Sequence, residues 1–385
     1  MLRWFVGVSI ILSASAAQAQ ARLVGDLPRK DAKALVELPG LETEYGQVRT
    51  MEGLRLRSIL TRPKGATARL PAILLTQSVS CGSLDFGADR QNQLRQIADR
   101  SGAVLVRIER SGSGDSEGPP CSALDYETEV RHYREAFDQI ARHPWIDPKR
   151  IILFGNSLGA TTAPLVVEGK PVAGIVVQGG GALTHLERMI NFDRIYLERS
   201  GKYTPAQIQE EMSRRIPFHV DYLVRGKTPE QIEKERPELK GVWASIRGGA
   251  EAPPHYGRPY TWHQQAAKRD FLEAWTKVNA PVLVFYGEYD QFETRHGHKL
   301  IADTVNRLRP GTATFIEVPS GDHELELYRS AEDAYAYREG RVDHDVFMVP
   351  LLDWLWKVAA PGRSRFTVSA ISLCPCRVSN WSCSP

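Results

Sequence analysis

The chain has 385 residues, of which 42% are hydrophobic and 25% charged, and its formal net charge is +3. This composition is typical of globular proteins and excludes a largely disordered chain. The small net charge, with no stripe of Lys and Arg, disfavours nucleic acid as a partner. The length fits one large α/β domain that carries an insertion.

The N-terminus has the layout of a secretory signal peptide. Arg3 precedes an apolar run, small residues follow, and Ala17-Gln18-Ala19 matches a cleavage site. The apolar run is too short to cross a bilayer core of ~30 Å, which disfavours an uncleaved anchor. We therefore expect residues 1–19 to be removed, and the mature protein to be exported to the periplasm or secreted. No later stretch is apolar enough for a transmembrane helix, so no stable membrane insertion is expected.

Strand and helix patterns alternate along the body of the chain. Residues 54–61 alternate apolar and polar side chains, as a half-exposed strand does. Residues 127–141 and 346–358 have the apolar spacing of helices. Short continuous apolar runs, typical of strands buried on both faces, occur at 71–76, 103–108, 151–154, 174–177, 281–286 and 314–318. The pattern predicts a mostly parallel sheet of about eight strands with helices on both faces, and such sheets carry functional residues at the carboxyl ends of their strands.

One long segment lacks this alternation of strands and helices. Residues 181–275 contain no buried strand run and are rich in charge and in helical spacing. We interpret them as a helical cap inserted into a core formed by residues 22–180 and 276–360. Residues 361–385 carry Ser, Cys and Pro without periodicity and are expected to form a disordered tail. Nothing in these patterns indicates the oligomeric state.

The five cysteines fall into two groups. Cys81 and Cys121 lie in the body of the chain, whereas Cys374, Cys376 and Cys383 lie in the tail. In an oxidising compartment Cys81 and Cys121 are candidates for a disulfide, and two unpaired thiols near a cleft are the alternative. The body contains no CxxC or Cys/His metal spacing, so no metal site is expected.

The clearest chemical signal is Gly155-Asn156-Ser157-Leu158-Gly159, between a buried strand run and a helix start rich in small residues. A serine on a sharp strand-to-helix turn has a strained backbone, and the residues two before and two after it must be small. The helix that follows directs its amide groups and positive dipole end toward the serine, which favours a developing oxyanion. This context predicts a nucleophile elbow rather than a plain Gly-rich turn.

A serine hydroxyl needs a base, and the base needs an orienting carboxylate. Asp290 follows the buried run 281–286, and His323 follows the last core strand, so both are expected at the edge of the sheet that carries Ser157. Their order of serine, acid and histidine is the one this type of sheet uses. Three residues are alternative candidates, namely Glu288 for the acid and His296 and His298 for the base.

The oxyanion needs two hydrogen-bond donors. One is expected to be the N–H of Leu158, and the other the N–H of Ser78 or Val79 in the loop after the strand that ends near residue 76. Residues 110–118 are Gly-rich, but they lack the lysine of a phosphate-binding loop and the glycine spacing of a nucleotide motif. We interpret them as a tight structural loop beside the site.

With these residues placed, the chain resembles the α/β-hydrolase family over residues 45–358, in particular its serine aminopeptidase-like and carboxylesterase-like branch with a helical cap. The resemblance rests on GNSLG at 155–159, RSGSGDSEG at 110–118, YGEYD at 286–290 and GDH at 321–323. It implies hydrolysis of an ester, thioester or amide through an acyl-enzyme, without a cofactor. Two departures stand out: Gln77-Ser78 replaces the usual His-Gly, and Asn156 replaces a frequent His.

The sequence is compatible with three functions. The first is a carboxylic ester or thioester hydrolase acting on a small molecule. The second is an aminopeptidase or other amide hydrolase acting on a short peptide, for which Glu187, Glu198 or Glu251 could bind the substrate's ammonium group. The third is a non-catalytic binding protein, which the presence of all three predicted catalytic residues disfavours.

Overall fold

The computed structural model describes residues 23–30, 35–86, 92–249 and 255–359. The predicted signal peptide, the predicted tail and the three tail cysteines lie outside these residues. Within the described part of the chain, no helix has the length and apolarity needed to cross a bilayer. A short antiparallel hairpin of β1 (Leu23–Val24) and β2 (Leu27–Pro28) precedes the main sheet.

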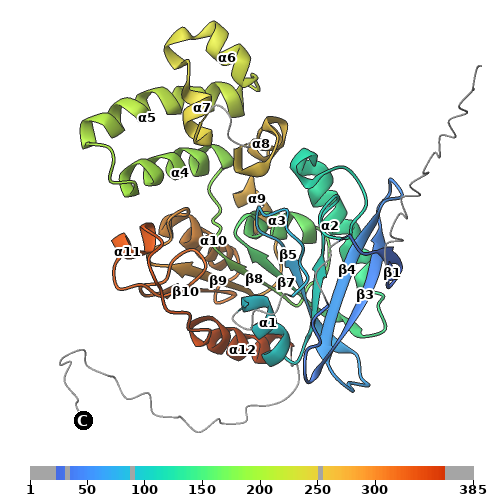
Figure 1. The fold of residues 1–385 in the computed structure, drawn as a ribbon. Coiled ribbons are helices and arrows are strands. Elements are labelled where there is room, and N and C mark those ends of the chain that lie inside the picture. Colours follow the sequence, from blue (N-terminus) through green and yellow to red (C-terminus); the bar gives the residue numbers. More distant parts are fainter. Residues whose placement is uncertain (1–22, 31–34, 87–91, 250–254, 360–385) are drawn as a thin grey trace, which may run out of the picture.

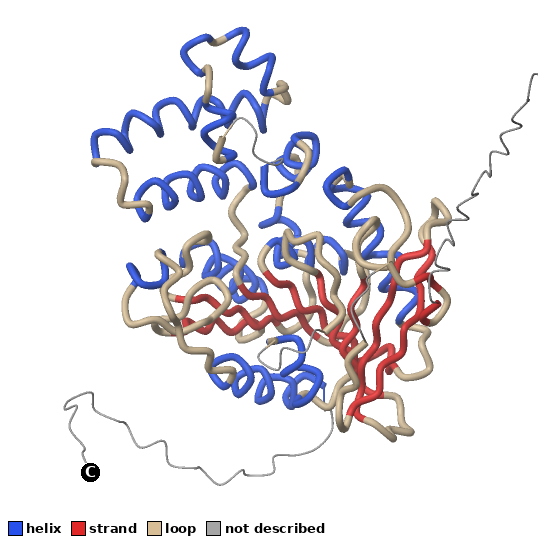
Figure 2. Tube along the Cα trace, viewed as in Figure 1, coloured by secondary structure: helices blue, strands red, loops and turns tan. Residues whose placement is uncertain are grey.

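An eight-stranded, mostly parallel sheet forms the centre of the protein, as predicted (Figures 1 and 2). Its strand order is β10-β9-β8-β7-β5-β6-β4-β3, and only the pairs β3–β4 and β4–β6 are antiparallel. The strands are β3 (Leu41–Arg49), β4 (Arg55–Pro63), β5 (Leu70–Thr76), β6 (Val104–Ile108), β7 (Ile146–Asn156), β8 (Gly174–Gln178), β9 (Val282–Gly287) and β10 (Ala313–Val318).

Helices cover both faces of this sheet. One face packs against α2 (Tyr126–Ile140), α3 (Leu158–Val167), α9 (Phe271–Thr276) and α10 (Arg295–Leu308). The other face packs against α1 (Gln93–Arg100) and α12 (Asp345–Ala359). Successive residues of the central strands alternate between the two apolar clusters, since side chains of a strand point to opposite faces. This explains why these strands read as continuous apolar runs in the sequence.

Between β8 and β9 the described residues form helices joined by loops, without a strand, and the part before α9 lies beyond the sheet edge where the parallel strands end (Figures 1 and 2). We call residues 181–270, which precede α9, the insertion. It contains α4 (His185–Arg199), α5 (Pro205–His219), the π-helical turn η2 (Val220–Val224), α6 (Pro229–Glu235), η3 (Pro237–Leu239), α7 (Val242–Arg247), η4 (His255–Gly257) and α8 (Tyr260–Ala267). Two short elements complete the fold, η1 (Cys121–Ala123) and α11 (Ala331–Tyr335).

Candidate active site

Ser157 occupies a strained turn between β7 and α3. Its φ of 52° and ψ of −118° are values that residues with a side chain rarely adopt. A Cβ atom on Gly159 would lie 1.8 Å from the carbonyl oxygen of Thr76, and one on Gly155 would lie 2.7 Å from Cα of Ala160. The two glycines predicted from the sequence are therefore required because the turn presses directly against its neighbours.

His323 contacts both Ser157 and Asp290. Its Nε2 lies 2.9 Å from Oγ of Ser157, and its Nδ1 lies 2.9 Å from Oδ2 and 3.0 Å from Oδ1 of Asp290. The backbone of His323 is fixed as well, since its N–H donates to Oε1 of Gln291 and its carbonyl accepts from Nε2 of Gln178. The structure thus brings together the three side chains that sequence order and strand-end position predicted to meet.

Electrostatics favour the charged form of this pair. Burial alone would raise the pKa of Asp290, but His323 outweighs it and the pKa is lowered. The Asp290 carboxylate also accepts the amide N–H groups of Phe292 and Glu293, at 2.8 and 2.9 Å. Burial alone would lower the pKa of His323, but attraction to Asp290 raises it above its ordinary value. A proton is therefore held more tightly on this imidazole than on an isolated one.

The alternative acid and the two alternative bases make other contacts. Glu288 is exposed, and its carboxylate accepts the amide N–H of Ser320 at 2.8 Å. His296 is exposed at the start of α10. His298 is buried, and its Nδ1 lies 2.9 Å from the carbonyl oxygen of Thr294.

The three residues predicted to donate to the oxyanion line the same pocket as Ser157. Leu158 is the first residue of α3, so its N–H belongs to the amides that a helix start leaves without an intrahelical acceptor. Ser78 and Val79 line the same pocket as Ser157. The geometry does not single out one of these two as the second donor.

Cys81 and Cys121 form a disulfide, with their Cα atoms 5.7 Å apart. Cys81 belongs to the loop after β5, and Cys121 begins η1, beyond the Gly-rich segment 110–118. The bond therefore links the loop that carries Ser78 and Val79 to the segment before α2, and it favours the first of the two sequence-based alternatives.

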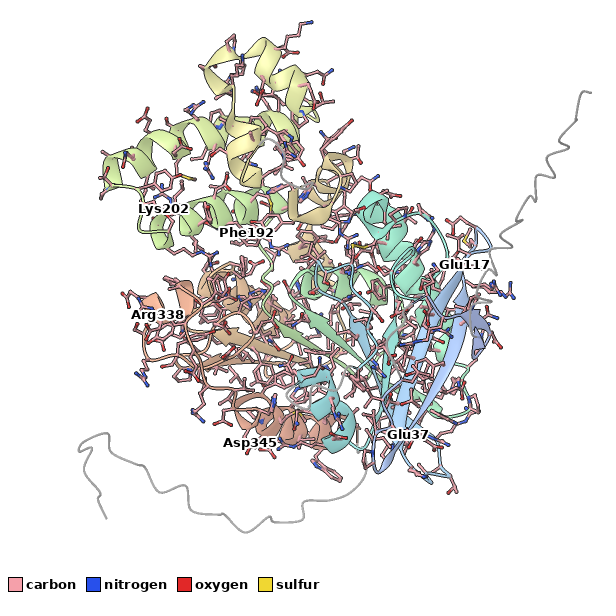
Figure 3. All side chains as sticks on the ribbon, viewed as in Figure 1. Glu37, Glu117, Phe192, Lys202, Arg338 and Asp345 are labelled. Carbon is pink, nitrogen blue, oxygen red and sulfur yellow. A yellow bond between two sulfur atoms is a disulfide. The ribbon has the colours of Figure 1, made fainter. Side chains whose placement is uncertain are left out.

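A pocket of about 790 Å³, including its open mouth, lies over Ser157 and His323. Besides those two, the core contributes Ser78, Val79, Ser80, Leu158, Phe292 and Glu324 to its walls. The insertion contributes His185, Arg188, Met189, Phe192, Tyr256, Trp262 and His263. Figure 3 shows Phe192 on α4 of the insertion. Most of this lining is apolar or aromatic, as in sites for small organic ligands.

Sequence reasoning did not find most of the insertion side chains of this pocket. Tyr256 and Trp262 were visible only as aromatic residues in a charged segment. His185, Arg188 and Phe192 carry no motif, although they lie on the first helix after β8. Two of the three predicted carboxylates are engaged elsewhere: Glu187 forms a capping box with Thr184, and Glu198 pairs with Arg194. Glu251 lies outside the described residues.

No group of three or more His, Cys, Asp or Glu side chains within the described ranges could hold a metal ion.

Comparison with known proteins agrees with the fold. The sequence model of the alpha/beta hydrolase family matches residues 80–338. A polyketide transferase from Stachybotrys chlorohalonatus is 32% identical over 117 residues, which are 30% of this chain and 36% of that protein. A thiohydrolase from Arthrinium phaeospermum is 26% identical over 187 residues, 47% of this chain and 56% of the other. A Mycobacterium bovis protein provisionally named a serine esterase is 26% identical over 232 residues, 54% and 36% respectively.

The matched region thus spans between about a third and just over half of the length of these relatives. Solved structures support the fold. A hypothetical protein from Pseudomonas aeruginosa superposes with a TM-score of 0.51 at 17% identity, over 88% of this chain and 99% of the other. An alpha/beta hydrolase from Penicillium sp. sh18 gives 0.50 at 15% identity, over 82% and 99%.

Proposed function

Since the chain belongs to the alpha/beta hydrolase family, we propose that it is a serine hydrolase that cleaves a carboxylic ester or thioester through an acyl-enzyme on Ser157. One observation carries the proposal: Nε2 of His323 lies 2.9 Å from the hydroxyl of Ser157, while its Nδ1 bonds the buried carboxylate of Asp290. A neutral imidazole held in this way can accept the hydroxyl proton as the oxygen attacks a carbonyl carbon.

In the acylation step, Oγ of Ser157 bonds to the substrate carbonyl carbon as its proton moves to Nε2 of His323. Asp290 stabilises the imidazolium that results, and it keeps Nδ1 protonated throughout. The carbonyl–leaving-group bond then breaks, and the imidazolium returns its proton to the departing alcohol or thiol. The products of this step are the acyl-serine ester and the free leaving group.

In the deacylation step, a water molecule replaces the leaving group. His323 accepts a proton from the water as its oxygen attacks the acyl carbon, and then returns that proton to Oγ of Ser157. A carboxylic acid departs and the free serine is restored. In both steps the negative charge on the former carbonyl oxygen is stabilised by the N–H of Leu158 and by a second amide, that of Ser78 or Val79.

The pocket supports a small, mostly apolar substrate. Met189, Phe192, Trp262 and Phe292 offer apolar and aromatic surface near Ser157. The thiohydrolase among the relatives supports including thioesters with esters as candidate substrates.

An aminopeptidase is the second candidate. It would need a carboxylate at the pocket, and Glu324 is the one carboxylate residue among the described lining residues. Its side chain is exposed, which provides weak support for recognition of an ammonium group. We therefore keep ester or thioester hydrolysis as the leading function and amide hydrolysis as the alternative.

We also propose that the protein works in an oxidising, exported environment. The Cys81–Cys121 disulfide supports this location, because such bonds persist mainly outside the cytosol. The signal-peptide pattern in residues 1–19 supports it independently.

Hydrolysis of p-nitrophenyl esters of increasing acyl length, measured beside amino-acyl anilides, tests the proposed function. We expect turnover of the esters that Ser157→Ala abolishes, with short or medium acyl chains preferred. Faster turnover of the anilides would favour the aminopeptidase. Ester turnover that persists in Ser157→Ala would refute the mechanism.

A further inference from the structure

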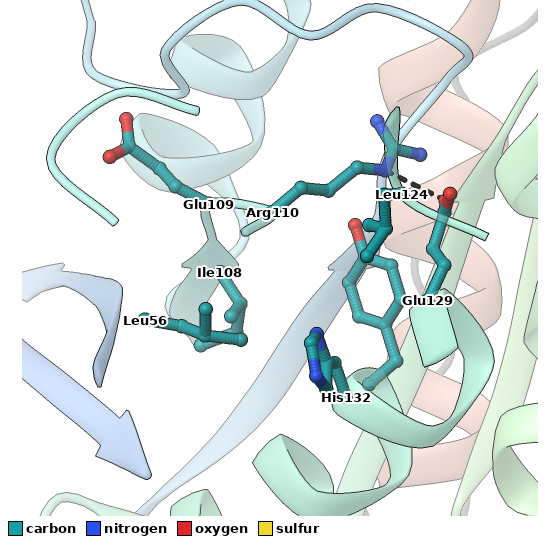
Figure 4. Close-up of a pocket in the computed structure, with 8 residues that line it drawn as sticks. Leu56, Ile108, Glu109, Arg110, Leu124, Glu129 and His132 are labelled. Atoms are coloured by element: carbon teal, nitrogen blue, oxygen red, sulfur yellow. Dashed lines mark hydrogen bonds and ion pairs between the residues drawn. The ribbon is translucent and has the colours of Figure 1, made fainter. Parts of the chain in front are cut away.

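A buried cluster of three charged side chains lies behind the loop that carries Ser78 and Val79. Glu129 on α2 accepts Nε of Arg110 at 2.7 Å, and its other oxygen lies 3.3 Å from Nη2 of Arg258. All three side chains are at most 3% exposed. Figure 4 shows Arg110 and Glu129 approaching each other from separate segments. Burial would raise the pKa of Glu129, but the two arginines lower it, so its carboxylate is charged.

Both arginines also hold the loop after β5 by its backbone. Arg110 donates to the carbonyl oxygens of Gln77 and Ser80, at 2.7 and 2.6 Å. Arg258 donates to the carbonyl oxygen of Val79 at 3.3 Å. Three of the four carbonyl groups between residues 77 and 80 are thus bound to guanidinium groups. Neither arginine lines the pocket over Ser157, so they hold this loop from outside the pocket.

Arg258 also contacts the disulfide. Its Nη1 donates to the carbonyl oxygen of Cys121 at 2.8 Å and lies 3.0 Å from Sγ of the same residue. Since Cys121 is bonded to Cys81, Arg258 contacts the loop near Val79 and also the residue that closes its far end. The loop is therefore fixed both along its backbone and at its end.

The two arginines differ in what they contribute to the net charge of the cluster. Arg110 alone neutralises Glu129, so the second guanidinium leaves the cluster with an excess buried positive charge. Burying an uncompensated charge costs free energy, which a purely structural ion pair would avoid. Arg258 also leaves its Nε without an acceptor among the described residues. We call residues 77–82, the loop that carries Ser78 and Val79, the oxyanion loop. The contacts of Arg258 with Val79 and Cys121 place its charge close to this loop, which offers a functional reason for that cost.

Arg258 also ties the oxyanion loop to the insertion. It lies between η4 and α8, and its neighbour Trp262 on α8 donates from Nε1 to Glu129 at 3.3 Å. Trp262 itself lines the pocket over Ser157. The same cluster therefore touches the insertion that forms the pocket and the loop that offers the second oxyanion donor.

We infer that Arg258 is a positioning residue for the oxyanion loop, which couples the placement of the insertion to stabilisation of the tetrahedral intermediate. The inference rests on the proposed serine hydrolase function. Binding of the ground-state ester depends mainly on the pocket walls. Loss of Arg258 therefore lowers kcat much more than it raises KM.

The decisive variant is Arg258→Met, which leaves the neutral pair Arg110–Glu129 in place. We expect kcat for a p-nitrophenyl ester to fall about 10- to 100-fold with KM changed less than about threefold, since complete loss of an oxyanion donor costs ~10²–10³. The affinity for an alkyl boronic acid, which forms a tetrahedral adduct on serine, should fall by the same factor as kcat/KM. Arg258→Lys should recover part of both losses, because an ammonium group can still reach one carbonyl.

Arg236→Met is the matched control. Arg236 belongs to the insertion and pairs with Asp221 and Glu238, away from the oxyanion loop and the pocket. We expect wild-type kcat and boronic acid affinity for this variant. If Arg258→Met behaves like Arg236→Met, or if its loss appears in KM with boronic acid affinity intact, the inference is wrong.

Two further outcomes are also decisive. If Arg258→Met fails to fold, Arg258→Gln carries the comparison, and wild-type kinetics in that variant would overturn the inference. A wild-type protein without Ser157-dependent ester turnover would overturn the proposed function, and this inference with it. If only the inference is wrong, the wild-type protein still hydrolyses the ester and Ser157→Ala does not.

Discussion

The sheet core and the insertion are held together in different ways. The core has an extensive apolar cluster on each face of the sheet. The insertion has a smaller apolar cluster and relies more on buried polar contacts. Examples are His185 with His263 at 3.1 Å, and Asp193 with both His219 and Arg215, at 2.8 and 3.3 Å.

This difference assigns separate roles to the two regions. The core places Ser157, Asp290 and His323 at strand ends, where the register of the sheet fixes their positions. The insertion supplies about half of the pocket lining, including most of its aromatic side chains. Substitutions of the core residues Ser157, Asp290 and His323 should therefore impair the chemical step, whereas substitutions of insertion side chains that line the pocket should mainly alter which substrate is chosen.

The largest effect is expected from His323→Ala in the core. Removing the base should lower kcat on a p-nitrophenyl ester by at least about 10⁴-fold, because triad members act as a unit. His296→Ala is the control, since that histidine is exposed and outside the triad. Steady-state kinetics at neutral pH would measure both. Comparable activity of the two variants would contradict the role of His323.

Asp290→Asn is expected to lower kcat by up to about 10⁴-fold, because the imidazole loses its orienting carboxylate. It should also move the pH profile. In the wild type, activity is lost as pH falls through the raised pKa of His323, so the acidic limb lies above pH ~6.5. Without Asp290 the pKa falls and the limb moves to lower pH. A profile of kcat/KM against pH would show this shift.

Glu288→Gln is the matched control for Asp290→Asn, because Glu288 bonds the Ser320 amide and not His323. It should leave the acidic limb where it is. An unshifted limb in Asp290→Asn, or an equal shift in Glu288→Gln, would refute the assigned acid.

A smaller effect is expected from Met189→Ala in the insertion. Enlarging the pocket should shift the preference toward longer acyl chains by about tenfold, since one or two methylene groups in an apolar pocket discriminate by ~1–3 kcal/mol. On the shortest ester, kcat should change less than about threefold. A panel of acyl esters would test this, with Met212→Ala, on α5 and outside the pocket lining, as the control. A uniform loss of kcat over all acyl chain lengths would contradict the proposal that the insertion selects the substrate while the core performs the chemical step.

The smallest effect at neutral pH, but a distinct one in acid, concerns the insertion histidines. Burial lowers the pKa of His185 and His255 well below the ordinary value, and that of His263 to about 4. These groups stay neutral when folded, whereas the unfolded chain binds protons below pH ~6.5. Their contribution to stability is therefore complete above pH ~6.5 and is lost as pH falls toward about 4.

Hydrogen exchange at pH 7 and pH 5 would measure this loss. We expect peptides of α4 and α8 to lose protection at pH 5 while those of β7 and α3 keep it. An equal loss of protection in both regions, or no loss in the insertion, would contradict the proposal that the insertion is the more acid-sensitive region.

The core was largely predictable from sequence because its signals are local. Apolar runs marked the buried strands, and GNSLG marked the turn at Ser157. The edge strand β3 and the short helix α1 were missed, since neither has a continuous apolar run and α1 spans only eight residues. Asp290 and His323 followed from chain order and the strand-end rule.

The insertion was predictable only as a helical segment. Periodicity identifies helices such as α5, but it does not encode the angles at which they pack. For this reason the pocket residue Phe192 was not found. The ion cluster was missed for a related reason, because Glu129 and Arg258 are far apart in sequence and look like ordinary solvated charges there.

Trapping the acyl-enzyme tests the central claim most directly. Incubation with a fluorophosphonate probe, followed by intact-mass and peptide mass spectrometry, should give one adduct per chain, on Ser157. His323→Ala should slow its formation by several orders of magnitude. An unlabelled wild-type protein, or an adduct on any other residue, would contradict the account.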